Sequence, residues 1–416
     1  MQGGEEHGVY PYRWVVLAAF MFVAALTQLM WLNYAPIATE TERLMGVSEF
    51  KVVLLATMFP LVYVPVSIPA GFIIDRKGFR FAVMIGALLT AAFSFLRLFV
   101  DNYALVLIGM IGISVGQPFV LNSITKMVST WFPTEESALA NGLGTLSLFL
   151  GMIVALAATP PLLKAFGEGE ISSLRWVVLI YSLAALAGFL LFAFLGRARP
   201  PRPPKRAETE ILGEDTAIDL GAVRSLFGLG NFRILCAVIL IGNGSFVGLM
   251  QLIEKILEPK GIGTSTAGNI GAVMVLAGVA GCVVLPSLSD RIMRRKPFLL
   301  LAAGMAAPTL LLMGVLEGAV PIFVVGGLLG FFLLSALPVL LAFSEETTGA
   351  HLTGTGTSVL LLLGNAGGVV ITLAMEGIKG LTGGEKGSFL WAMVFLAALF
   401  AAAFTLGTRL REEKIT

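Results

Sequence analysis

The residues of this chain that could bind a ligand are aromatic and amide side chains within long apolar segments. An indole ring offers its π face to a cation, and an amide both donates and accepts hydrogen bonds. Trp31 shares a helical face with Gln28, while Gln117 and Asn365 each lie about 21 Å along their own segments. The candidate ligand-binding residues are Gln28, Trp31, Tyr34, Gln117, Asn122, Asn243 and Asn365.

Each of these side chains also has a purely structural interpretation. A lone Asn or Gln inside a membrane can form an interhelical hydrogen bond that holds two helices together. Trp31 and Tyr34 can be core residues or part of an interfacial aromatic belt, which suits Tyr34 better because it lies nearer the outer surface. The sequence leaves both interpretations open.

Fixed charges are missing from the middle of every apolar segment. Glu254, Glu317 and Glu376 lie near outer ends, and Asp75 and Asp290 lie near inner ends. The proton relays of many pumps and transporters need a central carboxylate, and an organic anion would need a central cation. A charge-poor cavity therefore favours a neutral, zwitterionic or quaternary ammonium solute, the last being recognised by aromatic faces.

Motifs for catalysis and cofactor binding are absent from the sequence. It has no nucleophile elbow, no phosphate-binding loop and no zinc-protease helix. Cys236 and Cys282 lack metal-site spacing, and the two histidines cannot form a metal site unaided. Glycines in apolar runs, such as Gly142 and Gly367, are expected at close helix contacts. We therefore expect no enzymatic activity, no cofactor and no bound metal.

A charged motif follows the second apolar run. Residues 71–80 are Gly-Phe-Ile-Ile-Asp-Arg-Lys-Gly-Phe-Arg. They resemble the Gly-x3-Asp-Arg-x-Gly-Arg-Arg signature of the major facilitator superfamily, with phenylalanine replacing one late basic residue. Gly71 would permit close helix packing, and Asp75 would face the N-terminus of a neighbouring helix. Arg76 and Arg80 would hold that carboxylate and face anionic lipid.

The motif has an echo in the second part of the chain. Residues 286–295, Pro-Ser-Leu-Ser-Asp-Arg-Ile-Met-Arg-Arg, also end an apolar run on Asp-Arg, about half the chain later, as a duplicated half requires. Gly78 suits a tight turn. A generic basic loop is the alternative interpretation of the motif. The predicted gating residues are Gly71, Asp75, Arg76, Gly78, Arg80, Asp290, Arg291 and Arg294.

Composition identifies the solvent that the helices face. Of the 416 residues 57% are hydrophobic and only 13% are charged, with a mean hydropathy of +0.90. A soluble domain carries about twice that share of charge, so the chain must lie in lipid. The net charge of +2 argues against nucleic-acid binding. Twelve apolar runs are predicted to span, near 14–39, 50–74, 79–100, 103–128, 136–162, 174–196, 231–257, 267–289, 297–316, 319–343, 351–378 and 387–408.

One linker divides the runs into six and six. Residues 197–230 begin with a proline-rich basic stretch that cannot form a core, and apolar residues in 220–227 favour a short surface helix or an ordinary loop. With the N-terminus inside, 19 of the 28 Lys and Arg residues are cytoplasmic. We expect an N-terminal half at 1–196, a cytoplasmic linker and a C-terminal half at 231–416. We also expect the chain to lie in the plasma or inner membrane, with both termini in the cytoplasm.

Further stretches resemble one family within this superfamily. They are residues 63–65, Tyr-Val-Pro, and residues 114–122, Ser-Val-Gly-Gln-Pro-Phe-Val-Leu-Asn, followed by Trp-Phe-Pro at 131–133. They are similar to the feline leukaemia virus subgroup C receptor-related family, and the similarity spans nearly all of the chain outside the linker and termini. Members of that family transport choline and ethanolamine and have been discussed as haem exporters.

The resemblance implies a choline-type site. The family's helix-one tryptophan falls on Trp31, its helix-four glutamine on Gln117, and its helix-eleven glutamine on Asn365, a shorter amide. A helix-seven tyrosine falls near Val247 and a helix-ten glutamate near Ala342, so one aromatic wall and one charge of the family's site are replaced. The resemblance retains an aromatic ring with two amides in a charge-poor cavity.

These observations predict an all-α membrane protein of the major facilitator fold, with twelve transmembrane helices in two pseudo-symmetric halves. We expect a monomeric transporter that moves a small polar organic solute, choline-like or an amine, across the lipid bilayer by alternating access. An organic-acid or multidrug carrier is one alternative. A transport-inactive receptor or sensor is the alternative from another class.

Overall fold

The structure is a computed structural model that describes residues 9–167, 169–202, 204, 220–349, 352–382 and 389–412. Every regular element within these ranges is helical, and twelve segments are long and apolar enough to cross a membrane. The predicted fold class and number of spans are confirmed. Much of the predicted linker, residues 203 and 205–219, lies outside the described residues.

The helices before the linker are α1 (Tyr12–Leu32), η1 (Ala35–Ile37), α2 (Ala38–Met45), α3 (Glu49–Lys77), α4 (Phe79–Leu96), α5 (Tyr103–Leu121), α6 (Ile124–Trp131), α7 (Thr134–Ala165) and α8 (Ile171–Leu195). Those after it are α10 (Leu220–Gly228), α11 (Gly230–Leu257), η2 (Glu258–Lys260), α12 (Thr264–Ile292), α13 (Lys296–Val315), α14 (Ala319–Thr348), α15 (Thr353–Thr382) and α16 (Leu390–Thr408).

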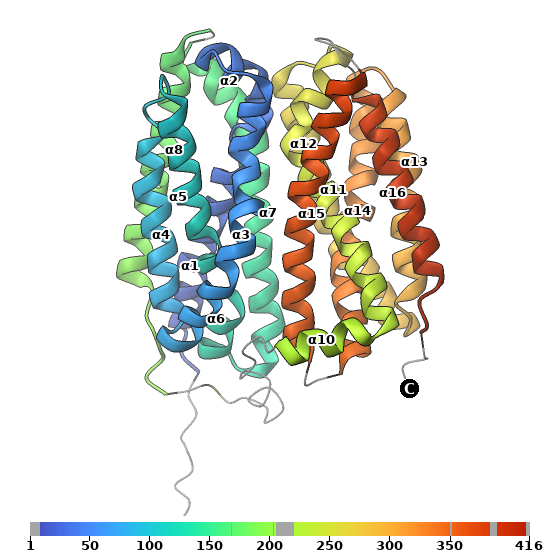
Figure 1. Cartoon of the computed structure of the whole chain (residues 1–416). Coiled ribbons are helices and arrows are strands. Elements are labelled where there is room, and N and C mark those ends of the chain that lie inside the picture. Colours follow the sequence, from blue (N-terminus) through green and yellow to red (C-terminus); the bar gives the residue numbers. More distant parts are fainter. Residues whose placement is uncertain are drawn as a thin grey trace, which may run out of the picture.

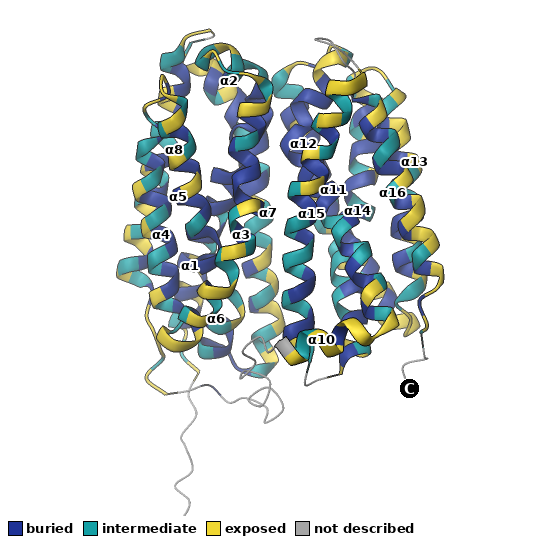
Figure 2. Cartoon of the chain, in the orientation of Figure 1, coloured by how far each residue is buried: buried dark blue, intermediate teal, exposed yellow. Residues whose placement is uncertain are grey.

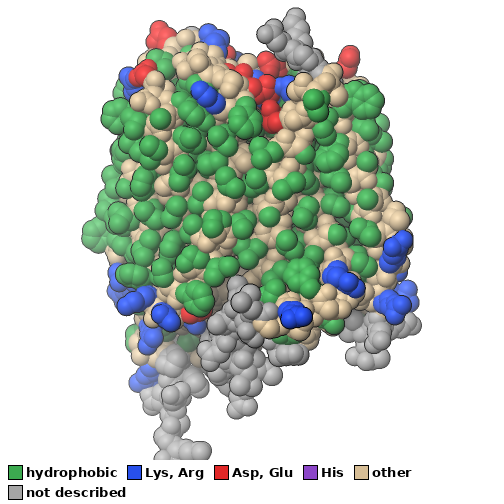
Figure 3. Space-filling model, viewed as in Figure 1, with side chains coloured by type: hydrophobic (Ala, Val, Ile, Leu, Met, Phe, Trp, Pro, Cys, Tyr) green, Lys and Arg blue, Asp and Glu red, His purple; other side chains and the backbone are tan. Residues whose placement is uncertain are grey.

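The helices form two groups that stand side by side, α1 to α8 and α10 to α16 (Figure 1). We call them the N-terminal and C-terminal halves. The short helices α6 and α10 lie at one end of the molecule, which we call the linker end. Helix α2 lies at the opposite end, which we call the α2 end. Exposed residues lie mostly on the outward faces (Figure 2), and on the face seen in Figure 3 an apolar belt lies between charged ends. A lipid environment requires such a belt.

Close helix pairs within each half cross at glycines. A Cβ on Gly151 would lie 2.0 Å from the Ala25 carbonyl oxygen, where α7 crosses α1, and one on Gly330 would lie 2.0 Å from that of Met274, where α14 crosses α12. Gly367 fits the same pattern, at 2.3 Å from the Leu240 oxygen. Dispersion contacts hold helices together in lipid, and small residues let the backbones approach. The packing expected at Gly142 is wrong, because a Cβ there would meet nothing within 4 Å.

The first span is broken where the candidate site begins. Helix α1 ends at Leu32, and the chain continues through η1, with Pro36 in its first turn, into α2. Proline cannot donate an intrahelical hydrogen bond, so it favours a break that begins a new helix. The break places the residues of η1 and α2 against the C-terminal half, where α11 and α12 pack against η1.

Candidate functional site

Trp31 lies in a hydrogen-bonded cluster that joins the two halves. Its indole Nε1 donates to the carbonyl oxygen of Ala56 on α3 at 3.2 Å. Gln251, from α11, donates to the same oxygen at 3.4 Å and accepts from the Thr57 hydroxyl at 3.0 Å. Trp31, Thr57 and Gln251 are all buried. We call Trp31, Ala56, Thr57 and Gln251 the Trp31 cluster. Sequence patterning alone gave no reason to place Gln251 against Trp31.

Gln117 and Asn365 lie at the middle depth that the sequence predicts. Gln117 is buried on α5, and no hydrogen bond of its side chain is found among the described residues. Asn365 is half-buried on α15 and donates only to the Leu361 carbonyl of its own helix, at 3.0 Å. The Trp31 cluster contains Ala56, about 10 Å along α3, whereas Gln117 lies about 21 Å along α5. Trp31 is thus about 10 Å nearer the α2 end than the amides.

The remaining candidate amides have other surroundings. Asn122 accepts from the Tyr63 hydroxyl at 2.8 Å and donates to the Ser67 hydroxyl at 2.9 Å, which ties α5 to α3. Gln28 is buried with one long contact, to Thr27 at 3.4 Å. Asn243 lines a small, mostly apolar pocket inside the C-terminal half. The structure therefore does not bring the seven predicted residues into one cluster.

Tyr34 belongs to a site built around a buried arginine. Arg97, directly after α4, is fully buried, and its guanidinium lies 5.0 Å from the centre of the Tyr34 ring. The same guanidinium contacts the Met30 sulfur at 3.2 Å. With its amide oxygen toward Arg97, Asn33 accepts from Nη2 at 2.8 Å. The cation thus lies at the C-terminal end of α1, where the helix dipole is negative. The Tyr34 hydroxyl finds no hydrogen-bond partner among the described residues.

Ion pairs and hydrogen bonds close the α2 end. Thr39 donates its N–H, at 3.1 Å, and its hydroxyl, at 3.0 Å, to the buried Glu254 of α11. Lys255 pairs with Glu42 of α2 at 2.9 Å. Lys379 of α15 also pairs across the halves, with Glu49 of α3. Every hydrogen bond and ion pair that joins described residues of the two halves lies in this region or in the Trp31 cluster. We call the two together the seam.

Carboxylates outnumber lysines at the seam. Among the described residues, five glutamates interact there with two lysines: Glu42, Glu49, Glu254, Glu258 and Glu376 with Lys255 and Lys379. Acidic side chains gather in the hollow between the two halves (Figure 3). A cleft lined by one sign of charge raises the local concentration of the opposite ion. The α2 end is thus electrostatically suited to a cation. No group of metal-binding side chains was found in the described part of the chain.

The basic motif is arranged differently from the prediction. Gly78 has a φ of +82° and ends α3, so its predicted turn is confirmed. The close packing predicted for Gly71 is wrong, because a Cβ there would meet nothing within 4 Å. Arg80 does not hold Asp75. It donates instead to the Ala193 and Gly196 carbonyls, which have no intrahelical partner at the end of α8. Asp75 and Arg76 are exposed, with no ion pair in the described residues.

In the echo motif, the partner of the aspartate is a later arginine. Asp290 pairs with Arg295, and not with Arg291 or Arg294, which are exposed. Met293 has a φ of +56°, so the chain turns back after α12 and presents Arg295. Arg295 also bonds Glu346 of α14 at 2.9 Å. Partial burial acts to lower the pKa of Arg295, but the hydrogen bonds to Asp290 and Glu346 outweigh it and raise this pKa above its ordinary value.

Comparison with known proteins agrees with this architecture. The model of the Major Facilitator Superfamily matches residues 17–372. The chain therefore belongs to the Major Facilitator Superfamily, a family of membrane transporters and not of enzymes. Its backbone is similar to a bacterial homologue of the human lysosomal transporter Spinster, with a TM-score of 0.78 at 16% identity over 96% of this chain and 97% of that one. It also resembles the transporter FucP, with a TM-score of 0.63 at 16% identity over 95% and 99% of the two chains.

Sequence relatives narrow the position within the family. The chain is 25% identical to the choline/ethanolamine transporter flvcr2b of Danio rerio, over 95% of this chain and 84% of the relative. It is 24% identical to the choline/ethanolamine transporter FLVCR2 of Homo sapiens, over 97% and 78%. It is 28% identical to an uncharacterized MFS-type transporter of Caenorhabditis elegans, over 98% and 70%. The predicted relationship to the feline leukaemia virus receptor-related proteins is confirmed.

Proposed function

We propose that this chain carries a small organic cation or zwitterion of the choline or amine type across a cell membrane, by alternating access between halves at 1–196 and 231–416. Similarity to choline/ethanolamine transporters over most of the chain supports this substrate class. So does the excess of glutamate at the seam, which would repel an organic acid. The proposed binding residues are Trp31, Gln117 and Asn365, with Gln28, Tyr34, Asn122 and Asn243 in lesser roles.

One observation carries the proposal: Trp31 and Gln251 share the Ala56 carbonyl as acceptor. A cation that binds the face of the Trp31 ring would alter the hydrogen bond from the indole N–H to this carbonyl, which also accepts from Gln251 of the other half. Binding at Trp31 and closure of the seam are then coupled through one acceptor. A ligand shifts a conformational equilibrium only through such differential contacts with the two states.

The same geometry suggests which side of the membrane is open. With the basic linker end in the cytoplasm, a closed seam at the α2 end corresponds to an inward-open state. Asp75, exposed and unpaired among the described residues, would then engage the other half only when the linker end closes. We propose that the gating motif of Asp75, Arg76 and Gly78 works as this second latch, with Asp290, Arg291 and Arg294 as its counterpart.

The test of the substrate is uptake of labelled choline by proteoliposomes that contain the purified chain. Saturable uptake is expected for the wild type and a loss of at least tenfold for Trp31→Ala, because the cation–π contact is removed. Trp391→Ala is the matched control, since Trp391 lies exposed on α16, and it should retain uptake. Uptake no greater than in empty liposomes, with uptake of an organic acid instead, would reject the proposal in favour of an anion carrier.

Orientation and assembly belong to the same proposal. We propose that both termini and the linker are cytoplasmic, in the plasma or inner membrane, and that one chain suffices for transport. Labelling of a cysteine introduced at Arg199 in sealed cells by an impermeant reagent should require permeabilisation. Reconstitution at one chain per vesicle should retain full uptake per chain. Binding of a solute without uptake of any solute would favour a receptor or sensor.

A further inference from the structure

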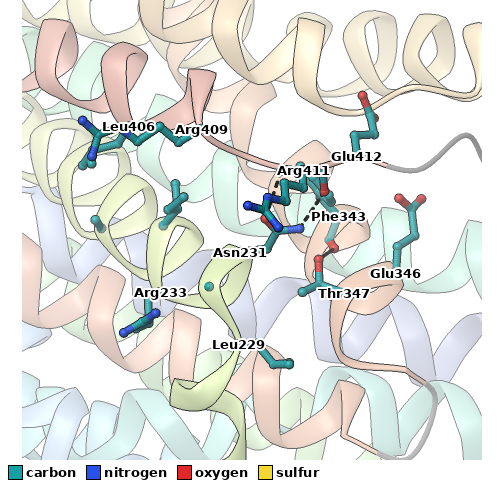
Figure 4. A pocket seen from close by; sticks show the side chains of 13 residues that line it. Leu229, Asn231, Arg233, Phe343, Glu346, Thr347, Leu406, Arg409, Arg411 and Glu412 are labelled. Atoms are coloured by element: carbon teal, nitrogen blue, oxygen red, sulfur yellow. Dashed lines mark hydrogen bonds between the residues drawn. The ribbon is translucent and has the colours of Figure 1, made fainter.

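A large pocket opens at the linker end of the C-terminal half, away from the seam. It has a volume of about 1140 Å³ and lies between the start of α11, the end of α14 and the segment after α16. Its apolar lining includes Leu229, Phe343 and Leu406, and three arginines lie around it, Arg233, Arg409 and Arg411 (Figure 4). The proposed transport cycle uses none of these residues.

The three arginines have no carboxylate partner among the described residues. Two glutamates also line the pocket, but both are engaged elsewhere. Glu346 accepts from Nε of Arg295 at 2.9 Å. Glu412 accepts from the backbone N–H groups of Arg295 and Lys296, the latter at 3.0 Å. Among the described residues, the pocket therefore offers three guanidinium groups that make no ion pair, against one carboxylate, Glu412, that backbone N–H groups hold.

Backbone groups add to this positive character. Asn231 donates to the Arg411 carbonyl at 2.7 Å and accepts from its N–H at 3.0 Å, so the segment after α16 is fixed against the start of α11. Leu229 provides no side-chain cap for α11. The first N–H groups of this 28-residue helix therefore lack a side-chain acceptor at the edge of the pocket, where the helix dipole is positive.

The surroundings of the pocket match the depth of lipid headgroups. Phe227 and Leu229 are exposed next to Arg224 and Arg233, and α10 runs across the linker end of this half (Figure 1). Apolar side chains beside arginines are typical of a helix that lies in the membrane interface. We propose that this pocket binds the phosphate headgroup of an anionic phospholipid, with Arg233, Arg409 and Arg411 as ligands of the phosphate and the apolar lining against the acyl chains.

The test uses the full chain, purified and stripped of lipid in detergent, and titrated with phosphatidylglycerol in native mass spectrometry. One tightly retained phosphatidylglycerol is expected, with weaker retention of phosphatidylcholine. The variant R233Q/R409Q/R411Q should weaken this binding on the order of a hundredfold, at about fivefold for each arginine. The matched control K77Q/R197Q/R199Q removes the same charge from exposed positions at the same end that do not line the pocket, and it should retain the lipid.

Each other outcome overturns the proposal. Equal weakening in both triple variants would show a diffuse surface potential and not a built site. Phosphatidylcholine bound as tightly as phosphatidylglycerol would remove the need for a net negative headgroup. Glycerol 3-phosphate bound as tightly as the lipid would make the ligand a free phosphate ester. The single variant Arg233→Gln, whose melting temperature should match the wild type, should show about fivefold weaker binding, and unchanged binding would likewise contradict the assignment.

Discussion

At the scale of single residues, loss of the Gln251 side chain should shift the equilibrium between the closed and the open α2 end. Gln251→Leu removes the hydrogen bonds to Thr57 and Ala56 across the seam while it keeps a buried side chain of similar volume. A net loss of about 1–2 kcal/mol is expected, which shifts the equilibrium about five- to thirty-fold toward an open α2 end. Modification of a cysteine introduced at Thr39 should accelerate accordingly. Asn141→Leu, whose amide bonds only the Ser137 carbonyl of its own helix, should leave that rate unchanged.

Residue types foretold only part of the candidate site. Hydropathy placed Gln117 and Asn365 at mid-depth because position along a helix sets depth. It could not say that Asn122 is satisfied by Tyr63 and Ser67, since that depends on which helices are neighbours. Arg97 stands close to the end of an apolar run, where an exposed charge is ordinary, yet it is fully buried. The end of α1 and the Tyr34 ring stabilise that charge, and both come from a distant part of the sequence.

At the scale of helices, the glycine crossings make a testable claim about packing. Gly330→Ala would place a methyl group 2.0 Å from the Met274 carbonyl oxygen, so α14 must move away from α12. A loss of about 1–3 kcal/mol in the free energy of unfolding is expected, as for other overpacked sites. The measurement is thermal unfolding in detergent. Gly142→Ala, which meets nothing within 4 Å, should be neutral or slightly stabilising because alanine favours helix; an equal loss in both variants would contradict the packing argument.

The twelve spans themselves were predictable because a bilayer imposes one length and one polarity on every crossing segment. For residues 220–227 the apolar spacing left a short helix and an ordinary loop open, and the structure shows the helix α10. Helix α1 was expected as one run, however, and the structure breaks it after Leu32. Pro36 was a local signal for a break. The glycines gave no such signal, because Gly142 and Gly367 lie in equally apolar runs and only the neighbouring helix distinguishes them.

At the scale of the whole molecule, the two halves must separate at the seam for transport, so its ion pairs should control the balance between states. Lys255→Glu would add a carboxylate beside Glu42 and Glu258 and should hold the α2 end open, with uptake reduced at least tenfold. The swap Glu42→Lys with Lys255→Glu restores the pair in reverse and should recover part of the uptake, short of the wild type because the new glutamate still faces Glu258. A coupling free energy of at least about 1 kcal/mol is expected from the double-mutant cycle on the open population.

The control is Arg175→Glu, which breaks an exposed pair with Asp101 and should cost little because solvent screens that pair. Additive effects of the two seam substitutions would mean that the Lys255–Glu42 pair does not hold the halves together, and closure would then rest on the Trp31 cluster and on the packing of α7 against α12.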